Sequence, residues 1–318
     1  MSNNLTGAGP FLGILPALLA RPGFFALKGC AFWANIAALK MEEQKKSRAG
    51  LPPVQPPASL DAVWGEIRAE AERISETEPV LRGLVCDVIL SRSNLFEAVA
   101  ARLARKLGAH AMPADLIRGV ILDAYEGSPE ARDAVVRDIV AINGRDPACL
   151  SCFDPLMYYK GFQAICTHRA AHILWRKGKK HTALYLQSLE SEIFAVDIHP
   201  AARFGAGILL DHATSFVAGE TCRVDDDVSI LHEVTLGGTG SETGDRHPKV
   251  CSGVLIGAGA KLIGNITIGE GAKIGAGSVV LDDVPPHTTV AGVPARPMGV
   301  SKEDTPSLIM NQKLDCRC

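Results

Sequence analysis

The chain has 318 residues, of which 47% are hydrophobic and 21% charged, so it can bury a sizeable core and is not disordered as a whole. Its 33 Lys and Arg residues are balanced by 35 Asp and Glu residues, which gives a formal net charge of −2. This balance argues against general nucleic-acid binding, because no basic excess is present to neutralise phosphates. The length predicts about two domains.

The nine cysteines are an odd number and are spread irregularly, which does not fit a disulfide framework and favours a reducing compartment. Cys149 and Cys152 form a lone C-x-x-C motif without a second pair. A zinc or redox role is open for them, but cysteines that pack as small apolar residues are the better interpretation. Cys316 and Cys318 lie at the C-terminus, and their role is left open.

The first 58 residues are expected to be a poorly ordered extension and linker. Residues 1–40 contain no acidic side chain, and the apolar run at 11–20 holds Pro16 and is too short to span a bilayer. Paired prolines between residues 52 and 57 favour an extended linker. We expect no membrane association and a cytoplasmic location; a mitochondrion or plastid is the alternative if residues 1–40 are a transit peptide.

Residues 59–192 have helical periodicity and predict an α-helical domain. Apolar residues recur in steps of three, four or seven over 60–74 and in steps of four over 95–107. Ser93 and Asn94 are candidate caps before the second of these helices, and Gly108 stands where a helix end favours glycine. Further helices are predicted at 131–142 and across 158–180.

Apolar anchor residues recur every six positions in the second half of the chain. Six is neither the helical period nor the alternation of an amphipathic strand, and it is typical of the hexapeptide repeats of a parallel β-helix. One coil cannot bury its apolar face alone, so stacked neighbours supply the core. We expect this domain at residues 193–290. The anchors are Ile198, Phe204, Leu210, Phe216, Cys222, Val228 and Val234, and then Val250, Ile256, Leu262, Ile268, Ile274 and Val280.

The two blocks of anchors are separated by a step that breaks the period. From Val234 to Val250 the step is 16 residues, which is not a multiple of six. A loop near 237–249 is therefore predicted to protrude, and a polar loop that interrupts a regular solenoid is a candidate functional site. Residues 291–318 are predicted to form a C-terminal tail.

His212 is the candidate general base. It follows an apolar anchor by two positions, so its side chain need not point into the core. A neutral imidazole accepts a proton near physiological pH, and a nearby carboxylate would hold its tautomer. Asp197 lies 15 residues upstream, close to one coil of three hexapeptides, so the two side chains could approach across adjacent coils. The alternative is that His212 only caps a corner, but Asp211, Arg246 and His247 accompany it and favour a functional role.

A metal site is the weaker interpretation of the histidines. His199, His232 and His247 lie far apart in sequence and form no compact ligand motif. His168 and His172 share one face of a helix, but the acid of an H-E-x-x-H motif is missing, so helix packing or a subunit contact is expected. We expect no bound metal and no permanently bound cofactor.

From about residue 59 to residue 300 the chain resembles the serine O-acetyltransferase family. Many acyltransferases share the hexapeptide repeat, whereas the segments around 145, 210 and 244 are specific. With the periodicity, the resemblance implies an α+β fold: an N-terminal α-helical domain followed by a left-handed parallel β-helix. The matching segments are Arg-Asp-Pro-Ala at 145–148, Pro-Leu-Met-Tyr-Tyr-Lys-Gly-Phe-Gln at 155–163, Val-Asp-Ile-His-Pro-Ala at 196–201, Leu-Asp-His-Ala-Thr at 210–214, Val-Thr-Leu-Gly-Gly-Thr-Gly at 234–240, Gly-Asp-Arg-His-Pro-Lys at 244–249 and Ala-Gly-Val-Pro-Ala-Arg at 291–296.

The resemblance implies acetyl transfer from acetyl-CoA, as co-substrate, to the hydroxyl of L-serine, which gives O-acetyl-L-serine and CoA for cysteine synthesis. It implies that His212 is the general base and that Asp197 orients it. We expect direct transfer in a ternary complex, without an acyl-enzyme. The substrate residues implied are Asp146 and Asp211 for the amino group of serine and Arg246 and His247 for its carboxylate. The implied coenzyme A contacts are Gly238, Thr239, Ala258, Lys273 and Ala276.

The resemblance also implies partners. Members of the family trimerise through the β-helix, with active sites between subunits, and typically pair trimers through the helical domain, so a homotrimer or a dimer of trimers is expected. L-cysteine is expected to inhibit by competing at the serine site. In many members a C-terminal Ile inserts into O-acetylserine sulfhydrylase; this chain ends in Cys318, which puts formation of that complex in doubt.

Three other functions were weighed against this one. A non-catalytic β-helix scaffold predicts loss of the base or its partner, yet His212 and Asp197 are both present. A γ-class carbonic anhydrase would require convergent histidine ligands and zinc. An acetyltransferase for a sugar or an antibiotic is disfavoured by the helical half and by the Arg-Asp-Pro-Ala segment.

Overall fold

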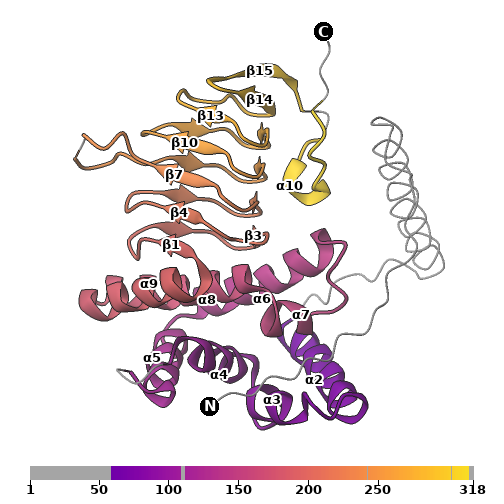
Figure 1. The fold of residues 1–318 in the computed structure, drawn as a ribbon. Coiled ribbons are helices and arrows are strands. Elements are labelled where there is room, and N and C mark those ends of the chain that lie inside the picture. The colour runs from indigo at the N-terminus through magenta and orange to yellow at the C-terminus, as the bar shows by residue number, and fades with distance from the viewer. Residues whose placement is uncertain (1–58, 109–111, 242, 302, 315–318) are drawn as a thin grey trace, which may run out of the picture. The chain divides into compact units, whose positions relative to one another are not determined.

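A computed structural model describes residues 59–108, 112–241, 243–301 and 303–314 of the chain, all within one compact unit that spans Gln55–Cys318. The predicted extension at 1–58 lies outside the described residues. Helices form the first half of this unit and a stack of short strands forms the second (Figure 1). The helices are α2 (Leu60–Thr77), α3 (Arg82–Val85), the π-helix η1 (Cys86–Leu90), α4 (Leu95–Leu107), α5 (Ala114–Glu126), α6 (Pro129–Arg145), α7 (Phe153–Met157), α8 (Lys160–Arg176) and α9 (Lys180–Phe194).

The helix predicted over 95–107 is confirmed with its caps. The Asn94 side chain accepts hydrogen bonds from the amides of Phe96 and Glu97, and α4 ends directly before Gly108. The helix predicted across 158–180 is shorter than predicted, because α8 spans Lys160–Arg176 and α9 begins at Lys180. Gly178 adopts a left-handed conformation (φ +77°) and ends α8, so α9 is a separate helix that runs on to Phe194. In the described part of the chain, no helix is long and apolar enough to cross a membrane.

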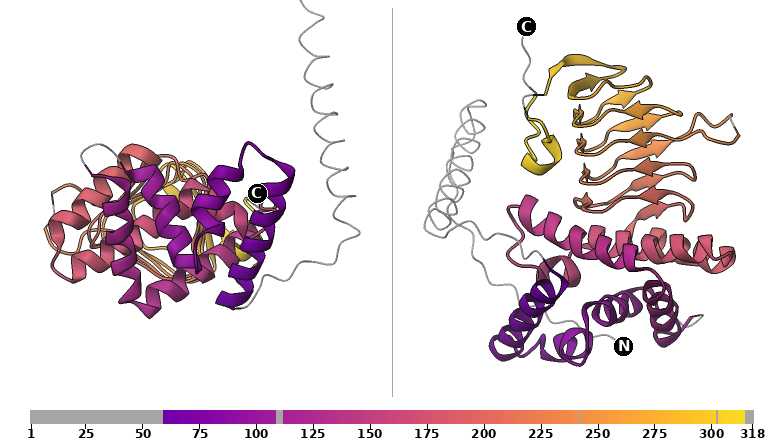
Figure 2. Two further views of the ribbon diagram at one scale, coloured as in Figure 1. Left: turned by 90° about the horizontal axis from the view of Figure 1, so that it is seen from below. Right: turned by 180° about the vertical axis from the view of Figure 1, so that it is seen from behind.

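The second half is a left-handed parallel β-helix whose strands form three sheets (Figure 2). Sheet A has the order β1-β4-β7-β10-β13, sheet B the order β11-β8-β5-β2, and sheet C the order β15-β14-β12-β9-β6-β3. The chain passes from sheet A to B to C in each coil. The strands are β1 (Val196–Ile198), β2 (Arg203–Phe204), β3 (Leu209–Leu210), β4 (Phe216–Ala218), β5 (Arg223–Val224), β6 (Ser229–Ile230), β7 (Thr235–Gly237), β8 (Lys249–Val250), β9 (Leu255–Ile256), β10 (Lys261–Ile263), β11 (Thr267–Ile268), β12 (Lys273–Ile274), β13 (Val279–Val280), β14 (Thr288–Gly292) and β15 (Ala295–Val300).

The coils do not all have the length that a strict six-residue period gives. Val217 pairs with Thr235, eighteen positions later, but Val196 pairs with Phe216, twenty positions later. The first coil therefore holds two extra residues, and the predicted anchors change phase there. In sheet A, Ile198 stacks on Ala218 of the second coil and on Leu236 of the third. The predicted anchors Phe216 and Val234 are also buried, but each lies two positions before the residue that continues the column from Ile198.

The predicted protruding loop is present between β7 and β8. Thr235 pairs with Lys261, twenty-six positions later, so this coil is eight residues longer than a regular one. The predicted start of the C-terminal tail at residue 291 is wrong, because it falls inside β14, which still belongs to sheet C. β15 then pairs antiparallel with β14, and the short helix α10 (Pro306–Ile309) follows.

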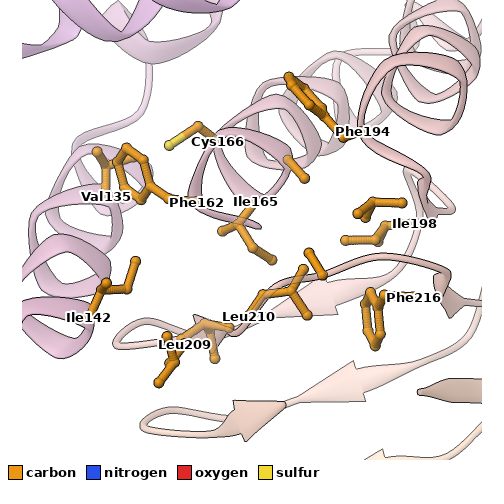
Figure 3. Packing of buried hydrophobic residues seen from close by; sticks show 14 of the residues in the cluster. Val135, Ile142, Phe162, Ile165, Cys166, Phe194, Ile198, Leu209, Leu210 and Phe216 are labelled. Atoms are coloured by element: carbon orange, nitrogen blue, oxygen red, sulfur yellow. The ribbon is translucent and has the colours of Figure 1, made fainter. Parts of the chain in front are cut away.

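One apolar cluster runs from the helices into the β-helix. Val135 and Ile142 of α6 and Phe162 of α8 lie against the first coil, where Leu209 and Leu210 are buried (Figure 3). His168, also on α8, is buried against the ring of Phe204, at 5.1 Å between ring centroids. The expectation that the His168–His172 pair serves helix packing is met for His168.

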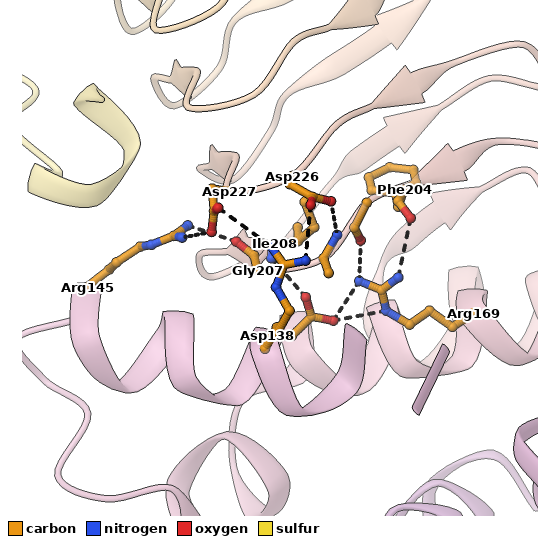
Figure 4. Close-up of polar contacts among 11 residues, drawn as sticks. Asp138, Arg145, Arg169, Phe204, Gly207, Ile208, Asp226 and Asp227 are labelled. Carbon is orange, nitrogen blue, oxygen red and sulfur yellow. Dashed lines mark hydrogen bonds and ion pairs between the residues drawn. The ribbon is translucent and has the colours of Figure 1, made fainter. Parts of the chain in front are cut away.

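Buried charges join α6 and α8 to the same coil (Figure 4). Arg169 donates from Nε and Nη2 to one carboxylate oxygen of Asp138, at 2.9 and 2.7 Å, and from Nη2 to the carbonyl of Gly205. The other oxygen of Asp138 accepts from the amide of Ile208 at 2.8 Å. Asp138 is 1% exposed and Arg169 6%. Because both side chains are shielded from water, each charge is stabilised mainly by the other.

Replacing Asp138 with alanine is therefore expected to destabilise the protein by about 3–5 kcal/mol, because it leaves the Arg169 guanidinium buried without its counter-ion. The measurement is the free energy of unfolding by chemical denaturation. Asp115→Ala is the matched control, because Asp115 pairs with Arg118 at the surface and its loss is expected to cost at most about 1 kcal/mol. Equal effects of the two substitutions would contradict the importance given to the buried pair.

Candidate active site

The two extra residues of the first coil lie in the corner that carries His212. Five residues, 211–215, separate β3 from β4, which begins at Phe216. In the next coil Val234 is equivalent to Phe216, so the equivalent corner has three residues, 231–233. His212, Ala213 and Ser215 all have positive φ angles, of 55°, 60° and 60°. Such conformations cost energy in residues other than glycine, and they cluster at functional sites. We call residues 211–215 the His212 corner.

Acidic and imidazole groups gather around this corner. His212 is exposed, at 74% of its side chain, and its Nε2 lies 3.8 Å from Oδ1 of Asp211. The His232 ring, one coil further along, lies 5.8 Å from the His212 ring between centroids. Burial raises the pKa of Asp211; His212 opposes this shift, and the nearby Asp146 carboxylate adds to it. Asp211 and His212 therefore lie side by side, and Asp146 is close enough to raise the pKa of Asp211.

A second group lies at the other end of the sheet A strands. Arg246 donates to the carboxylate of Glu220 at 3.0 Å. Nδ1 of His247 lies 2.9 Å from the hydroxyl of Thr221. The backbone at Gly219 leaves no room for a side chain, because a Cβ there would lie 1.9 Å from Nε2 of His247. Burial lowers the pKa of His247, and the positive charge of Arg246 lowers it further.

These two groups occupy different edges of the β-helix. The His212 corner joins sheet C to sheet A, whereas Arg246 and His247 lie where the chain passes from sheet A to sheet B. The strands of sheet A have two or three residues, so about 10 Å of strand separates the edges. A single chain does not bring the six predicted catalytic and serine-binding residues together. The spacing of the motifs did not predict this separation, whereas the family resemblance implied active sites between subunits. Glu220 and Thr221 were not singled out by any motif.

Asp197 lies between these edges and has another partner than the predicted one. It lies in the middle of β1, and its Oδ1 accepts a hydrogen bond of 2.6 Å from the Gln187 side chain on α9. In the described chain, no hydrogen bond or ion pair joins Asp197 to His212, and Asp211 is the carboxylate that lies 3.8 Å from the His212 ring. The role of Asp197 as the acid that orients His212 stays a prediction.

The predicted coenzyme A residues also divide between the two edges. Ala258 and Ala276 lie on the edge that carries His212: the Gly259 amide donates to the His232 carbonyl at 2.9 Å, and the Gly277 amide to the Ala258 carbonyl at 2.7 Å. Gly238 and Thr239 begin the protruding loop on the other edge. Lys273 is buried on β12 of sheet C, and its Nζ donates to the carbonyl of Lys313 at 2.6 Å.

The histidines and cysteines that the sequence analysis considered as metal ligands lie in separate parts of the fold. His199 lies 5.1 Å from the Trp175 ring between centroids, and His172 contacts the Pro200 carbonyl through Nδ1. In residues 59–314, apart from the few positions that are not described, no three histidine, cysteine or acidic side chains gather as a metal site would require. Cys149 and Cys152 are both buried. Burial raises the pKa of the Cys149 thiol to about 12 and that of Cys152 further.

Comparison with known protein families identifies both halves of the chain. Residues 63–167 match the family described as serine acetyltransferase, N-terminal, and residues 247–282 match the bacterial transferase hexapeptide family of six repeats. The serine acetyltransferase of Salmonella typhimurium is 52% identical over 81% of this chain and 94% of its own length. Serine acetyltransferase 3, mitochondrial, from Arabidopsis thaliana is 47% identical over 80% of this chain and 66% of its own.

Solved structures of similar proteins include three complexes. A serine acetyltransferase from Brucella abortus in complex with coenzyme A has a TM-score of 0.74 and 53% identity, covering 75% of this chain and 96% of that one. A serine acetyltransferase in complex with cysteine has a TM-score of 0.77 and 51% identity, covering 79% and 98%. Soybean serine acetyltransferase complexed with serine has a TM-score of 0.73 and 54% identity, covering 74% and 97%.

The raised thiol pKa values predict that Cys149 and Cys152 resist alkylation. Only the thiolate reacts, and at pH 8 both groups remain thiols because their pKa values lie far above this pH. Native protein treated with iodoacetamide is expected to stay unmodified at both positions, and guanidinium-unfolded protein to be modified at both, as measured by peptide mass spectrometry. Rapid modification of the native protein would favour the redox interpretation of the C-x-x-C motif instead.

Proposed function

The chain belongs to the serine acetyltransferase family, and we propose that His212 is the general base of its reaction, the transfer of acetyl from acetyl-CoA to the hydroxyl of L-serine. The hydroxyl is a poor nucleophile until a base takes its proton, and such a base contributes roughly 10²–10⁴-fold. The observation that carries the proposal is the His212 corner: an exposed imidazole held on strained backbone beside the Asp211 carboxyl group. Family membership favours acyl transfer over the scaffold, carbonic anhydrase and sugar acetyltransferase alternatives.

Asp146 and Asp211 are proposed to hold the amino group of serine. An ammonium group that enters between two carboxyl groups gains from both, and it offsets the burial that raises the pKa of Asp211. Asp197 is proposed as the acid that orients His212, on the basis of the resemblance of its segment. Asp211 is the competing candidate for that role because it lies 3.8 Å from His212.

Arg246 and His247 are proposed to bind the carboxylate of serine from a second copy of the chain. Arg246 offers a guanidinium that can form a paired, charge-assisted contact with a carboxylate. It lies on the opposite edge from His212, and a neighbouring copy that turns this edge toward the His212 corner would complete the site. A closed ring of three copies repeats the same contact three times, so we propose a homotrimer, or two trimers paired through their helical halves.

Acetyl-CoA is proposed to lie along the edge that rises from His212. Ala258 and Ala276 are stacked on this edge and leave space for an extended chain, and Lys273 lies on the adjoining sheet. Backbone amides at Gly238 and Thr239 of the neighbouring copy are proposed to meet the thioester, where one preorganised donor to the oxyanion is worth about 3 kcal/mol. Thiolate is a good leaving group, so transfer is proposed to be direct, in a ternary complex, without a metal or an acyl-enzyme.

L-cysteine is proposed to inhibit the enzyme by competing with L-serine. The two amino acids share their amino and carboxylate groups, which are the groups that Asp146, Asp211, Arg246 and His247 would bind, and a related enzyme has been solved in complex with cysteine. The product, O-acetyl-L-serine, would then serve cysteine synthesis.

A cytoplasmic location is proposed for the protein, with an organelle as the alternative.

Replacing His212 with alanine is expected to lower kcat by about 10²–10⁴-fold while the protein stays folded. The measurement is the release of CoA thiol from acetyl-CoA, with and without L-serine. His181→Ala is the matched control, because His181 is an exposed histidine on α9 away from the site, and it is expected to keep wild-type activity. Thiol release that survives His212→Ala would keep the enzyme class but exclude His212 as the base.

Two further variants in the same assay decide which acid orients the base. Asp197→Asn is expected to lower kcat with little change in KM for L-serine, because an orienting acid acts on the base and not on the substrate. Asp211→Asn is expected to raise KM for L-serine. The reverse pattern would assign orientation to Asp211 and withdraw the role proposed for Asp197.

Co-expression of two inactive variants tests whether the site lies between copies. His212→Ala and Arg246→Ala each remove one half of the proposed site, so a mixed oligomer is expected to regain activity wherever an intact His212 meets an intact Arg246 of its neighbour. A ring of three that contains both variants has one such interface, so about a third of its sites are expected to be restored. The chains carry different tags, so that only mixed oligomers are purified and assayed. Mixed oligomers without activity would show that each site is built within one chain.

A further inference from the structure

The first turn of α8 lies directly against the His212 corner. A Cβ at Gly161 would lie 1.9 Å from the carbonyl oxygen of Leu210 and 3.2 Å from Cβ of Ala213. Only glycine lets the helix backbone come this close to the corner. The segment 155–163 was prominent in the sequence without a role in the chemistry, and this contact explains its glycine.

The residue before this glycine reaches the corner with its side chain. Nζ of Lys160 donates a hydrogen bond of 2.6 Å to Oγ1 of Thr214. The Thr214 hydroxyl in turn lies 3.4 Å from the carbonyl oxygen of His212, and the Thr214 amide donates to the same oxygen at 2.7 Å. Lys160, Thr214 and His212 thus form a chain of hydrogen bonds, in which each bond polarises the next.

Other backbone contacts fix the remainder of the corner. The amide of Ser215 donates to the Ala195 carbonyl at 2.7 Å, and the amide of Glu233 donates to the Thr214 carbonyl at 2.7 Å. These contacts hold the corner from the end of α9 and from the next coil. Among the described residues, Lys160 is the helical residue whose side chain donates a hydrogen bond to the His212 corner.

The backbone matters here because the His212 side chain has little else to hold it. The ring is largely exposed, and its described neighbours are Asp211 at 3.8 Å and the His232 ring. Its position follows from a φ of +55° that the corner must maintain against strain. A displacement of the base by about 1 Å can cost about 10²-fold in rate.

We propose that Lys160 is a positioning residue for acetyl transfer, which acts through Thr214 to hold the His212 corner in its strained conformation. The inference rests on the proposal that His212 is the general base. It differs from a substrate-binding role for Lys160, because a lysine that contacted serine or coenzyme A would change KM, whereas one that positions the base changes kcat.

The test compares kcat and KM for both substrates in four variants at the two positions. Lys160→Met removes the donor and keeps the length of the side chain, and it is expected to lower kcat about 10-fold with KM nearly unchanged. Lys160→Arg keeps a charged donor and is expected to restore most of kcat. Thr214→Val removes the hydroxyl at nearly constant shape and is expected to match Lys160→Met, whereas Thr214→Ser keeps the hydroxyl and most of kcat. Lys106→Met, at an exposed position on α4, is the matched control and is expected to leave both constants unchanged.

The double variant Lys160→Met with Thr214→Val separates one shared contact from two independent effects. If the residues act through one contact, its kcat falls no further than that of either single variant. Additive losses, an unchanged kcat in Lys160→Met, or a rise in KM alone would each overturn the proposal. If Lys160→Met fails to fold, Thr214→Val and Thr214→Ser carry the test, because they leave the lysine in place.

A failure of this inference can be told from a failure of the proposed base. His212→Ala with wild-type activity would remove the premise, whatever the result at Lys160. An inactive His212→Ala beside a fully active Lys160→Met would keep the base and exclude only the positioning role.

Discussion

A β-helix ends on an open edge, and the backbone groups of its first coil must be satisfied by something other than another coil. In this protein the helices α6 and α8 provide the partners. Arg169 donates to the carbonyls of Phe204 and Gly205, and Asp138 accepts from the Ile208 amide. Arg145 donates to the Gly207 carbonyl in the same way. The helical half is therefore the cap of the solenoid, and the two halves form one compact unit for this reason.

Charged side chains form this cap, so their burial costs desolvation energy while their hydrogen bonds fix the geometry of the junction. A buried ion pair offsets its own desolvation only when the geometry is good and the remaining hydrogen bonds are made, and the Asp138–Arg169 pair meets both conditions. Its directional bonds also fix where α8 lies along the first coil. Because α8 begins at Lys160 and Gly161, the same helix that caps the open edge brings its first turn against the His212 corner. The stability of the junction and the geometry of the base thus depend on one helix.

The sequence predicted the parts of the molecule that follow a period. The helix at 95–107, with Asn94 and Gly108 at its ends, and the six-residue repeat were both read from spacing. The predicted phase of the early anchors was wrong because a coil of twenty residues can satisfy the same apolar pattern as one of eighteen, since inward positions recur every two residues along a strand. Spacing therefore does not reveal an insertion at a corner.

The candidate site shows a further limit of prediction from one chain. The spacing identified which residues carry acids, bases and cations, but not that they divide between two edges of the solenoid; the family resemblance alone implied active sites between subunits. Coils stacked about 4.8 Å apart form a stiff column, and such a column cannot bend to bring Arg246 to His212. Each edge alone is chemically incomplete: one carries the acids with the base, and the other carries the guanidinium. A rigid fold whose candidate site residues divide between two edges supports the proposal that a second copy of the chain completes the site.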